Sequence, residues 1–261
     1  MSETIRINKY IANAGICSRR DADKLVESGK VTVNGIIATP GMGVSSKDVV
    51  CVTGKEIKAK DDKVVLAFYK PIGITCTERD KYAKTTILEY VKYPVRVTYA
   101  GRLDKDSEGL ILLTNDGELI QALMKGSHYH EKEYVVKVDK DISQIFLDKM
   151  SEGVYLTELD RTTRPCKVEM VGKRTFKIVL TQGLNRQIRR MTKELGYTVT
   201  SLKRIRIEKI TIDGLKIGQY RELTEKEKEN LYIRCNYWHK RLYVEIFNGT
   251  FKFGKTRIFS C

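Results

Sequence analysis

Residues 101–119 read GRLDKDSEGLILLTNDGEL, and this stretch places Asp104 and Asp106 in a short loop bracketed by glycines. The strand-like run VRVTYA precedes the loop and LILLTN follows it, so the pattern predicts a connection at the end of a sheet. Loops in that position often carry the residues that bind or react. The stretch therefore predicts part of a sheet and a candidate site at Asp104.

The chemistry of the two carboxylates stays open on composition and spacing alone. A metal-binding pair would hold phosphate groups through a bridging cation. Glycosidase carboxylates must flank the scissile bond, which two residues so close in sequence do poorly. A turn stabilised by Asx-type hydrogen bonds is a further interpretation, because Asp is common in such loops. Catalysis by Asp104 and a purely structural turn are both compatible with the pattern.

The sequence around this loop predicts an α+β fold. The runs VVLAFYKP, YVVKVDK, RTFKIVLTQ and RIRIEKITIDG are typical of strands, and helix-like segments separate them at residues 116–125, 143–152 and 187–195. Strands outnumber helices and form apparent hairpins, which favours a mainly antiparallel sheet over a doubly wound one. We expect this sheet in a domain that spans residues 62–234.

The first 61 residues predict a smaller unit that ends in a charged linker. Apolar residues at helical spacing lead to Gly15, and Ser18 can cap a second helix that ends at Gly29. VTVNG then predicts a hairpin. On the second helix, Arg19, Arg20 and Lys24 can share one face. Residues 235–261 contain a further alternating pattern and predict an extra hairpin.

Charge indicates the class of partner. The net charge is +15, and residues 161–209 contain fourteen Lys and Arg against three Asp and Glu. A field of this sign favours nucleic acid, and RNA above all. The chain has no signal-peptide pattern and no apolar run long enough to span a bilayer, so we expect a cytoplasmic protein with no membrane partner.

The sequence favours neither a metal nor an organic cofactor. The six cysteines contain no CxxC pair, and the HYH motif at residues 128–130 has no acidic or thiol partner that would complete a metal site. No glycine-rich phosphate-binding motif stands at a strand-to-helix turn. We therefore predict no cofactor.

The segment INKYIANAGICSRRDADKLVESGKVTVNG resembles the S4 domain, an RNA-binding module, and the resemblance covers residues 5–52. It implies that Arg19, Arg20 and Lys24 contact RNA. Residues 101–117 are similar to the signature of the RsuA and RluA groups of pseudouridine synthases. KPIG, HEKEYVV and LTQGLNRQIRRM follow the same family order at residues 70–73, 130–136 and 180–191.

The second resemblance implies an isomerase that converts a uridine in RNA to pseudouridine after flipping it out of its stack. Asp104 is implied as the nucleophile, Tyr134 as the active-site tyrosine and Arg189 as the arginine that pairs with Asp104. Asp106 is assigned a structural role in the loop. The remaining assignments are RNA contacts and a pocket wall: Arg102, Arg186 and Arg190 for RNA, and Leu180 for the wall.

The likeness to the RsuA-type branch favours large-subunit ribosomal RNA as substrate, and we expect a monomer. Small-subunit ribosomal RNA and the tRNA anticodon remain alternatives, with tRNA also open as a second substrate. The rival hypothesis is a non-catalytic S4-type RNA-binding protein.

Overall fold

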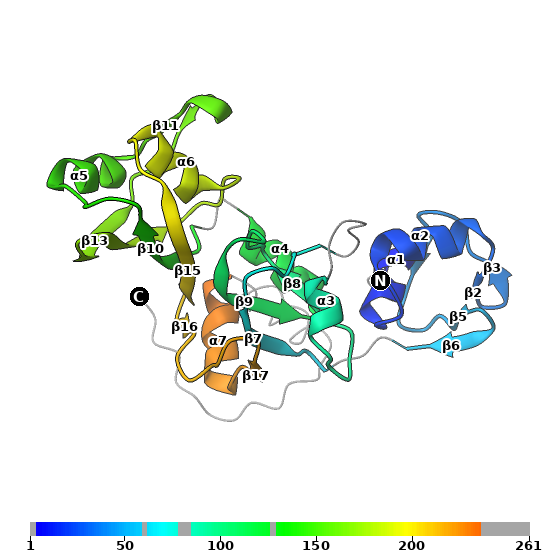
Figure 1. Ribbon diagram of the computed structural model, residues 1–261. Helices are drawn as coiled ribbons and strands as arrows, with labels where there is room; N and C mark the ends of the chain where they lie inside the picture. The colour runs from blue at the N-terminus through cyan, green and yellow to red at the C-terminus, as the bar shows by residue number, and fades with distance from the viewer. Residues whose placement is uncertain (1–3, 59–61, 78–84, 126–128, 236–261) are drawn as a thin grey trace, which may run out of the picture.

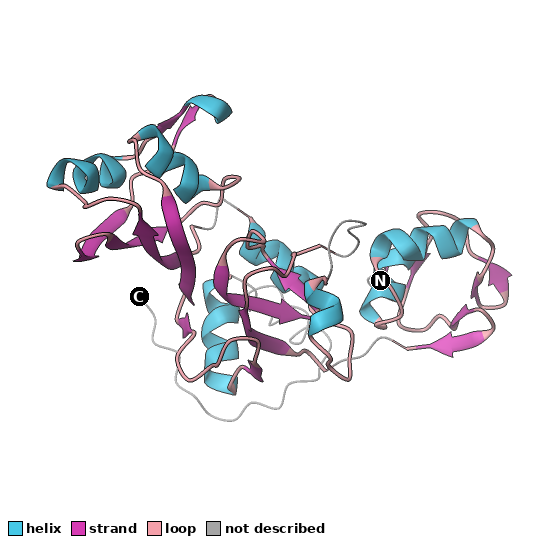
Figure 2. Cartoon of the chain, in the orientation of Figure 1, coloured by secondary structure: helices cyan, strands magenta, loops and turns pink. Residues whose placement is uncertain are grey.

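The computed structural model describes residues 4–58, 62–77, 85–125 and 129–235. The predicted hairpin in residues 235–261 lies outside the described residues except for Cys235, and so does His128 of the HYH motif. The chain forms a small N-terminal body followed by a large sheet with helices around it (Figure 1). Both parts mix helices and strands (Figure 2), which confirms the α+β prediction.

The N-terminal body begins with two helices, α1 (Ile7–Asn13) and α2 (Arg19–Glu27). The Ser18 hydroxyl caps α2 by accepting a hydrogen bond from the backbone N–H of Asp21 at 3.2 Å, as predicted. Asn34 and Gly35 have φ values of 51° and 83°, the left-handed backbone that a tight hairpin requires. This turn joins the first two strands of the small sheet, so the predicted VTVNG hairpin is confirmed.

The small sheet has four strands in the order β3-β2-β5-β6. Two further short strands, β1 and β4, pair with each other. Their bounds are β1 Ile5–Arg6, β2 Val31–Val33, β3 Ile36–Ile37, β4 Gly43–Val44, β5 Val50–Val52 and β6 Lys55–Ile57.

The large sheet has nine strands, of which seven follow the order β13-β14-β10-β15-β9-β7-β17, while β16 pairs with β15 and β8 with β9. All described pairings in this sheet are antiparallel except that between β9 and β15. The bounds are β7 Val65–Lys70, β8 Thr98–Ala100, β9 Glu108–Thr114, β10 Lys132–Val138, β13 Lys167–Gly172, β14 Thr175–Leu180, β15 Val199–Ile207, β16 Ile210–Thr211 and β17 Tyr220–Glu222. The mainly antiparallel sheet is confirmed.

Helices α4 (Gly117–Met124), α5 (Gln144–Glu152) and α6 (Gln187–Glu194) form where the sequence predicts them. Helices α3 (Ile87–Tyr90) and α7 (Glu225–Arg234) were not predicted, and each begins with a capping box. Between α5 and β13, strands β11 (Tyr155–Leu156) and β12 (Arg161–Thr162) flank a single 3₁₀ turn, Thr157–Leu159. No described helix is both long and apolar enough for a membrane span.

The large sheet consists of two half-sheets whose cores are partly shared, because the cluster around Leu112 also contains Ile207 of β15 and Ile210 of β16. The first half-sheet (β7, β8, β9 and β17) packs around Leu112 on one face and Ile111 on the other. The second half-sheet (β10, β13, β14 and β15, with β16 at its edge) packs around Val136 and Phe176 against α5 and α6. The side chain of Tyr134 packs against the cores of both half-sheets. Figure 1 shows the second half-sheet beside the first, with β15 and β9 adjacent.

The two half-sheets meet at a short seam, which in the described sheet comprises only the pairs Lys203–Glu108 and Arg204–Gly109. Gly109 has a φ of +116°, and a Cβ atom there would lie 2.2 Å from the carbonyl oxygen of Arg204. Because ordinary contact begins near 3.4 Å, only glycine permits so close an approach of the two backbones. The seam follows directly after Ser107, the last residue of the loop that carries Asp104.

A candidate active site at the seam

The loop that carries Asp104 connects β8 to β9 and is fixed by the buried side chain of Lys70. The Lys70 Nζ donates hydrogen bonds to the carbonyl oxygens of Pro71, Asp104 and Ser107 at 3.0, 3.1 and 2.8 Å. Burial lowers the pKa of Lys70, and the negative charges of the Asp carboxylates oppose this effect. The ammonium group therefore sits where loop carbonyls and nearby carboxylates compensate its charge.

Arg204 holds the same loop from the other half-sheet. This arginine is buried, and its Nε donates to the carbonyl oxygen of Leu110 at 2.6 Å while Nη1 reaches that of Arg102 at 3.5 Å. The two carbonyls flank the Asp104 loop on either side. Neither Lys70 nor Arg204 was predicted as a site residue, although Lys70 ends an otherwise apolar strand, which is a signal that a lysine is buried.

Asp104 lies beside Arg186, with 3.5 Å between its Oδ2 and the Arg186 Nη1. The Asp104 side chain is 33% exposed, so a bound substrate can reach it. Arg186 also forms two hydrogen bonds to the Asp106 carboxylate, at 3.2 and 3.0 Å. Arg186 is the N-cap residue of α6 and has a left-handed backbone conformation. Helix α6 therefore begins beside the loop that carries Asp104.

The ion pair of Arg189 differs from the sequence prediction. The structure pairs the Arg189 Nη2 with the Asp106 Oδ2 at 3.3 Å, not with Asp104. The same nitrogen donates to the Asp106 carbonyl oxygen at 3.0 Å and to the Ser107 hydroxyl at 3.3 Å. Arg189 lies one helical turn beyond Arg186, so the two arginines reach different parts of the loop. The assignment of Arg189 as the direct partner of Asp104 is therefore corrected, and Arg186 takes that position.

Asp106 forms ion pairs with both Arg186 and Arg189 and so connects α6 to the loop. Partial burial raises the pKa of its carboxyl group, but the hydrogen bonds from Arg186 and the charges of Arg189 and Arg186 outweigh burial and hold the pKa below its usual value. Asp106 therefore stays ionised at neutral pH. Its carboxylate joins the first half-sheet to α6, which packs on the second.

Tyr134 lies on β10, opposite Ile178 of β14 and Arg204 of β15. The pairing of β10 with β15 shifts register between Glu133 and Tyr134, immediately before the tyrosine. Leu180 is buried at the end of β14 and pairs with Lys132. Burial and the charge of Arg204 lower the pKa of Lys132 to about 8. A partly buried aromatic ring, a buried leucine and this lysine thus gather at one end of β10.

The six residues predicted to bind RNA fall into two groups, and Arg186, described above, belongs to the group near Asp104. Arg102 is exposed two residues before Asp104, whereas Arg190 is ion-paired with Glu158 and bonds the carbonyl oxygen of Asn185 at 3.0 Å. The other three cations, Arg19, Arg20 and Lys24, are exposed on α2. The structure therefore offers Arg102 to a ligand near Asp104 and engages Arg190 within the protein.

Metal binding by the two carboxylates receives no support from their neighbours. Both face arginines, and the described residues contain no group of three His, Cys, Asp or Glu side chains that could hold an ion. The site instead offers an accessible carboxylate with cations around it and the aromatic ring of Tyr134 on β10, which β15 separates from β9. Such a set can hold an anionic ligand while the carboxylate attacks or stabilises a positively charged centre.

Known proteins share both parts of the chain. Residues 64–194 match the family model for RNA pseudouridylate synthase, and residues 5–50 match the S4 domain. The dual-specificity RNA pseudouridine synthase RluF of Escherichia coli is 45% identical over 231 residues, which cover 88% of this chain and 79% of the relative. The ribosomal large subunit pseudouridine synthase B of Bacillus subtilis is 37% identical over 234 residues, which cover 87% and 95%.

A solved structure shows the same architecture. The crystal structure of a pseudouridylate synthase superposes with a TM-score of 0.64 at 28% identity and covers 87% of this chain and 99% of the other. Sequence and fold thus agree over both the S4 body and the large sheet. The chain belongs to the RsuA-type RNA pseudouridine synthases, a family of isomerases.

Proposed function

We propose that this pseudouridine synthase isomerises a specific uridine of large-subunit ribosomal RNA and that Asp104 is its nucleophile. The observation that carries the assignment is the accessible Asp104 carboxylate beside Arg186, on a loop whose backbone the buried Lys70 and Arg204 hold. A nucleophile must be accessible and held in one place, and this loop provides both.

The reaction needs no redox partner, because the product has the same atoms as the substrate. The bond from the ribose C1′ to N1 of uracil breaks, the base rotates, and C5 forms the new bond to C1′. C5 then loses its proton, and N1 gains one. Asp104 would attack C1′ or assist formation of a glycal, and both routes use the same carboxylate.

Tyr134 and Arg189 complete the proposed catalytic group. The Tyr134 ring would stack on the extruded uracil, and its hydroxyl would lie near C5 when the proton leaves. Arg189 would act through Asp106, since its ion pair and hydrogen bonds fix the loop next to the nucleophile. Leu180 would form a wall of the uracil pocket.

RNA contacts near the site would come from Arg102 and Arg186, with Arg190 a weaker candidate because Glu158 already neutralises it. Arg19, Arg20 and Lys24 of α2 would bind the phosphate backbone. Flipping a uridine costs a few kcal/mol, which such contacts can offset. We assign residues 1–61 to the RNA-binding unit, residues 62–234 to the catalytic unit and residues 235–261 to a C-terminal extension, in a monomer.

Large-subunit ribosomal RNA is favoured as substrate by the relatives, one of which is named for the large ribosomal subunit and another as a dual-specificity enzyme. A substrate in the ribosome would place the enzyme in the cytoplasm. Transfer RNA is the second candidate substrate, and pseudouridine mapping in total RNA covers it as well.

The test is pseudouridine mapping in total RNA from a strain that lacks the gene, complemented with the natural chain or with the Asp104→Asn variant. We expect one or more large-subunit sites to disappear on deletion, to return with the natural chain and to stay absent with Asp104→Asn. The variant should still bind the RNA with a Kd near that of the natural chain. If deletion changes no pseudouridine in any RNA, the chain acts as a binding protein and the proposal is wrong.

A further inference from the structure

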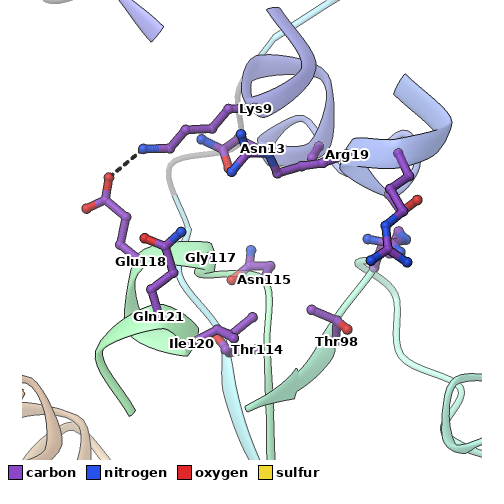
Figure 3. Close-up of a pocket in the computed structure, with 14 residues that line it drawn as sticks. Lys9, Asn13, Arg19, Thr98, Thr114, Asn115, Gly117, Glu118, Ile120 and Gln121 are labelled. Carbon is purple, nitrogen blue, oxygen red and sulfur yellow. Dashed lines mark hydrogen bonds and ion pairs between the residues drawn. The ribbon is translucent and has the colours of Figure 1, made fainter. Parts of the chain in front are cut away.

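A cavity of about 330 Å³ lies between the N-terminal body and the large sheet, away from the Asp104 loop. Helices α1 and α2 line one side of it with Lys9, Arg19 and Arg20. Residue Arg96, strand β8 and helix α4 line the other side. Figure 3 shows Lys9, Asn13 and Arg19 on the helical side, facing Glu118, Gln121 and Thr98 across the cavity.

The cavity carries an excess of positive charge. Four cationic side chains line it, and Glu118 is its single acidic lining residue among the described ones. Glu118 forms an ion pair with Lys9 at 2.8 Å, so its charge is already matched within the wall. The remaining cations come from both parts of the chain, two from α2 and one, Arg96, from the segment before β8. Counted over both walls, the lining carries four cations and one carboxylate, a net charge of +3, most of it on the side of α1 and α2.

Arg96 lies within electrostatic range of the N-terminal body. Burial and the charge of Asp21 raise the pKa of the Cys17 thiol in the turn between α1 and α2, and the charge of Arg96 acts in the opposite direction. The turn and Arg96 are thus close enough for one ligand to contact both.

Hydrogen-bonding groups are also available on both walls. The amides of Asn13 and Gln121 and the guanidinium of Arg20 make no side-chain hydrogen bond or ion pair to any residue in the described part of the chain. All three line the cavity. Amide and guanidinium groups in this arrangement suit phosphate and ribose oxygens.

We propose that this cavity binds the sugar-phosphate backbone of a single RNA strand and that Arg96 supplies the catalytic-domain half of the site. The proposal rests on the proposed function in that the strand belongs to the substrate RNA. A volume of 330 Å³ corresponds to about eleven water molecules at roughly 30 Å³ each, which suits part of one strand and is far too small for a duplex.

The distance between the cavity and the Asp104 loop predicts how many nucleotides separate the bound backbone from the modified uridine. Thr98 and Thr114 pair at the cavity end of strands β8 and β9, while the Asp104 loop joins the opposite ends of the same strands. Strand β9 runs from Glu108 to Thr114, which is about 20 Å at roughly 3.4 Å per residue. A stacked strand with a spacing of roughly 3.4 Å would cover this length in about six nucleotides.

The test uses the full chain with the Asp104→Asn substitution, which allows binding to be measured without turnover. Its affinity for a uridine 20-mer is measured between low and physiological salt. Arg96→Ala and Arg20→Ala should each reduce the slope of log K against log salt by about 0.7, the value for one lost contact to a single strand. Lys47→Ala and Lys226→Ala remove exposed cations outside the cavity and should leave the slope unchanged. Circular dichroism checks that each variant is folded.

Hydroxyl-radical footprinting on a transcript of large-subunit RNA tests the spacing. We expect a protected patch about six nucleotides from the modified uridine, and we expect Arg96→Ala to remove that patch alone. If Arg20→Ala lowers the slope and Arg96→Ala does not, the N-terminal body binds RNA through another face and the proposal fails. Because the 20-mer assay needs no modification, its result stands apart from a failure of the proposed enzymatic function.

Discussion

Replacing Gly109 with Ala should lower both stability and turnover, because this residue lies at the seam beside the loop that carries Asp104. The new Cβ would stand 2.2 Å from the Arg204 carbonyl oxygen and 2.6 Å from its nitrogen. To reach ordinary contact at 3.4 Å, the two backbones must move apart by about 1.2 Å. The positive φ of +116° adds strain for any residue with a side chain.

The expected magnitudes follow from these two effects. Overpacking costs about 1–3 kcal/mol, and an unfavourable backbone region costs about 1–3 kcal/mol more. The free energy of unfolding should therefore fall by roughly 2–6 kcal/mol. A displacement near 1 Å between Asp104, the proposed nucleophile, and its partners should also lower kcat by about 100-fold. The second effect should be visible below the melting temperature, where the chain is still folded.

The assay is single-turnover release of the C5 proton from tritiated uridine in RNA, with unfolding followed by circular dichroism. Gly214→Ala is the matched control, since Gly214 has a φ of +76° but no atom beyond its chain neighbours lies within 4 Å of the place that a Cβ would occupy. We expect the control to lose about 1 kcal/mol of stability and to keep its kcat. If Gly109→Ala loses stability and retains the natural kcat, the seam does not position the nucleophile.

Three further predictions follow from the charged groups. Lys132→Met should raise the free energy of unfolding at pH 7 by up to about 3 kcal/mol, because folding lowers the pKa of this lysine from 10.5 to about 8. The unfolded chain binds more protons between these two pH values, so the gain should shrink above pH 8 and vanish near pH 10.5 in denaturant titrations. Asp106→Asn should lower kcat about 10- to 100-fold without abolishing it, by loosening the loop. Because the folded pKa of Asp106 is depressed, its stabilising effect is present above pH ~4 and is lost as the pH falls through the folded pKa, so the melting temperatures of Asp106→Asn and the natural chain should converge in acid. Arg189→Lys should lower kcat more than it raises KM, since a lysine cannot reproduce the contacts to both Asp106 and Ser107, and steady-state kinetics would contradict this if only KM changed.

Local signals in the sequence were sufficient for most helices and strands. Ser18 caps α2 and the Asn34–Gly35 pair makes the first hairpin, since both depend on a few neighbouring residues. Helix α7 was missed because its first turns are almost wholly charged and show no apolar stripe. The parallel pairing at the seam joins segments nearly a hundred residues apart, so no local pattern could predict it.

In the candidate site, too, some features could be predicted from the sequence and others depend on tertiary packing. Resemblance to a family supplied the roles of Asp104, Tyr134 and Arg189, which composition and spacing alone had left open. The partner of Arg189 could not be predicted, because it depends on how α6 docks against the loop. Lys70 and Arg204 were missed because a basic residue in a strand usually lies on the surface, and only the packed structure shows that these two are buried.

The seam gives the enzyme a mechanical property. Asp104 belongs to one half-sheet and Tyr134 to the other, and only two residue pairs of the described sheet join the halves. Ile207 and Ile210 of the second half also belong to the core around Leu112, so a change in the angle between the halves would disturb that core. Substitutions at the seam should therefore change turnover and stability together.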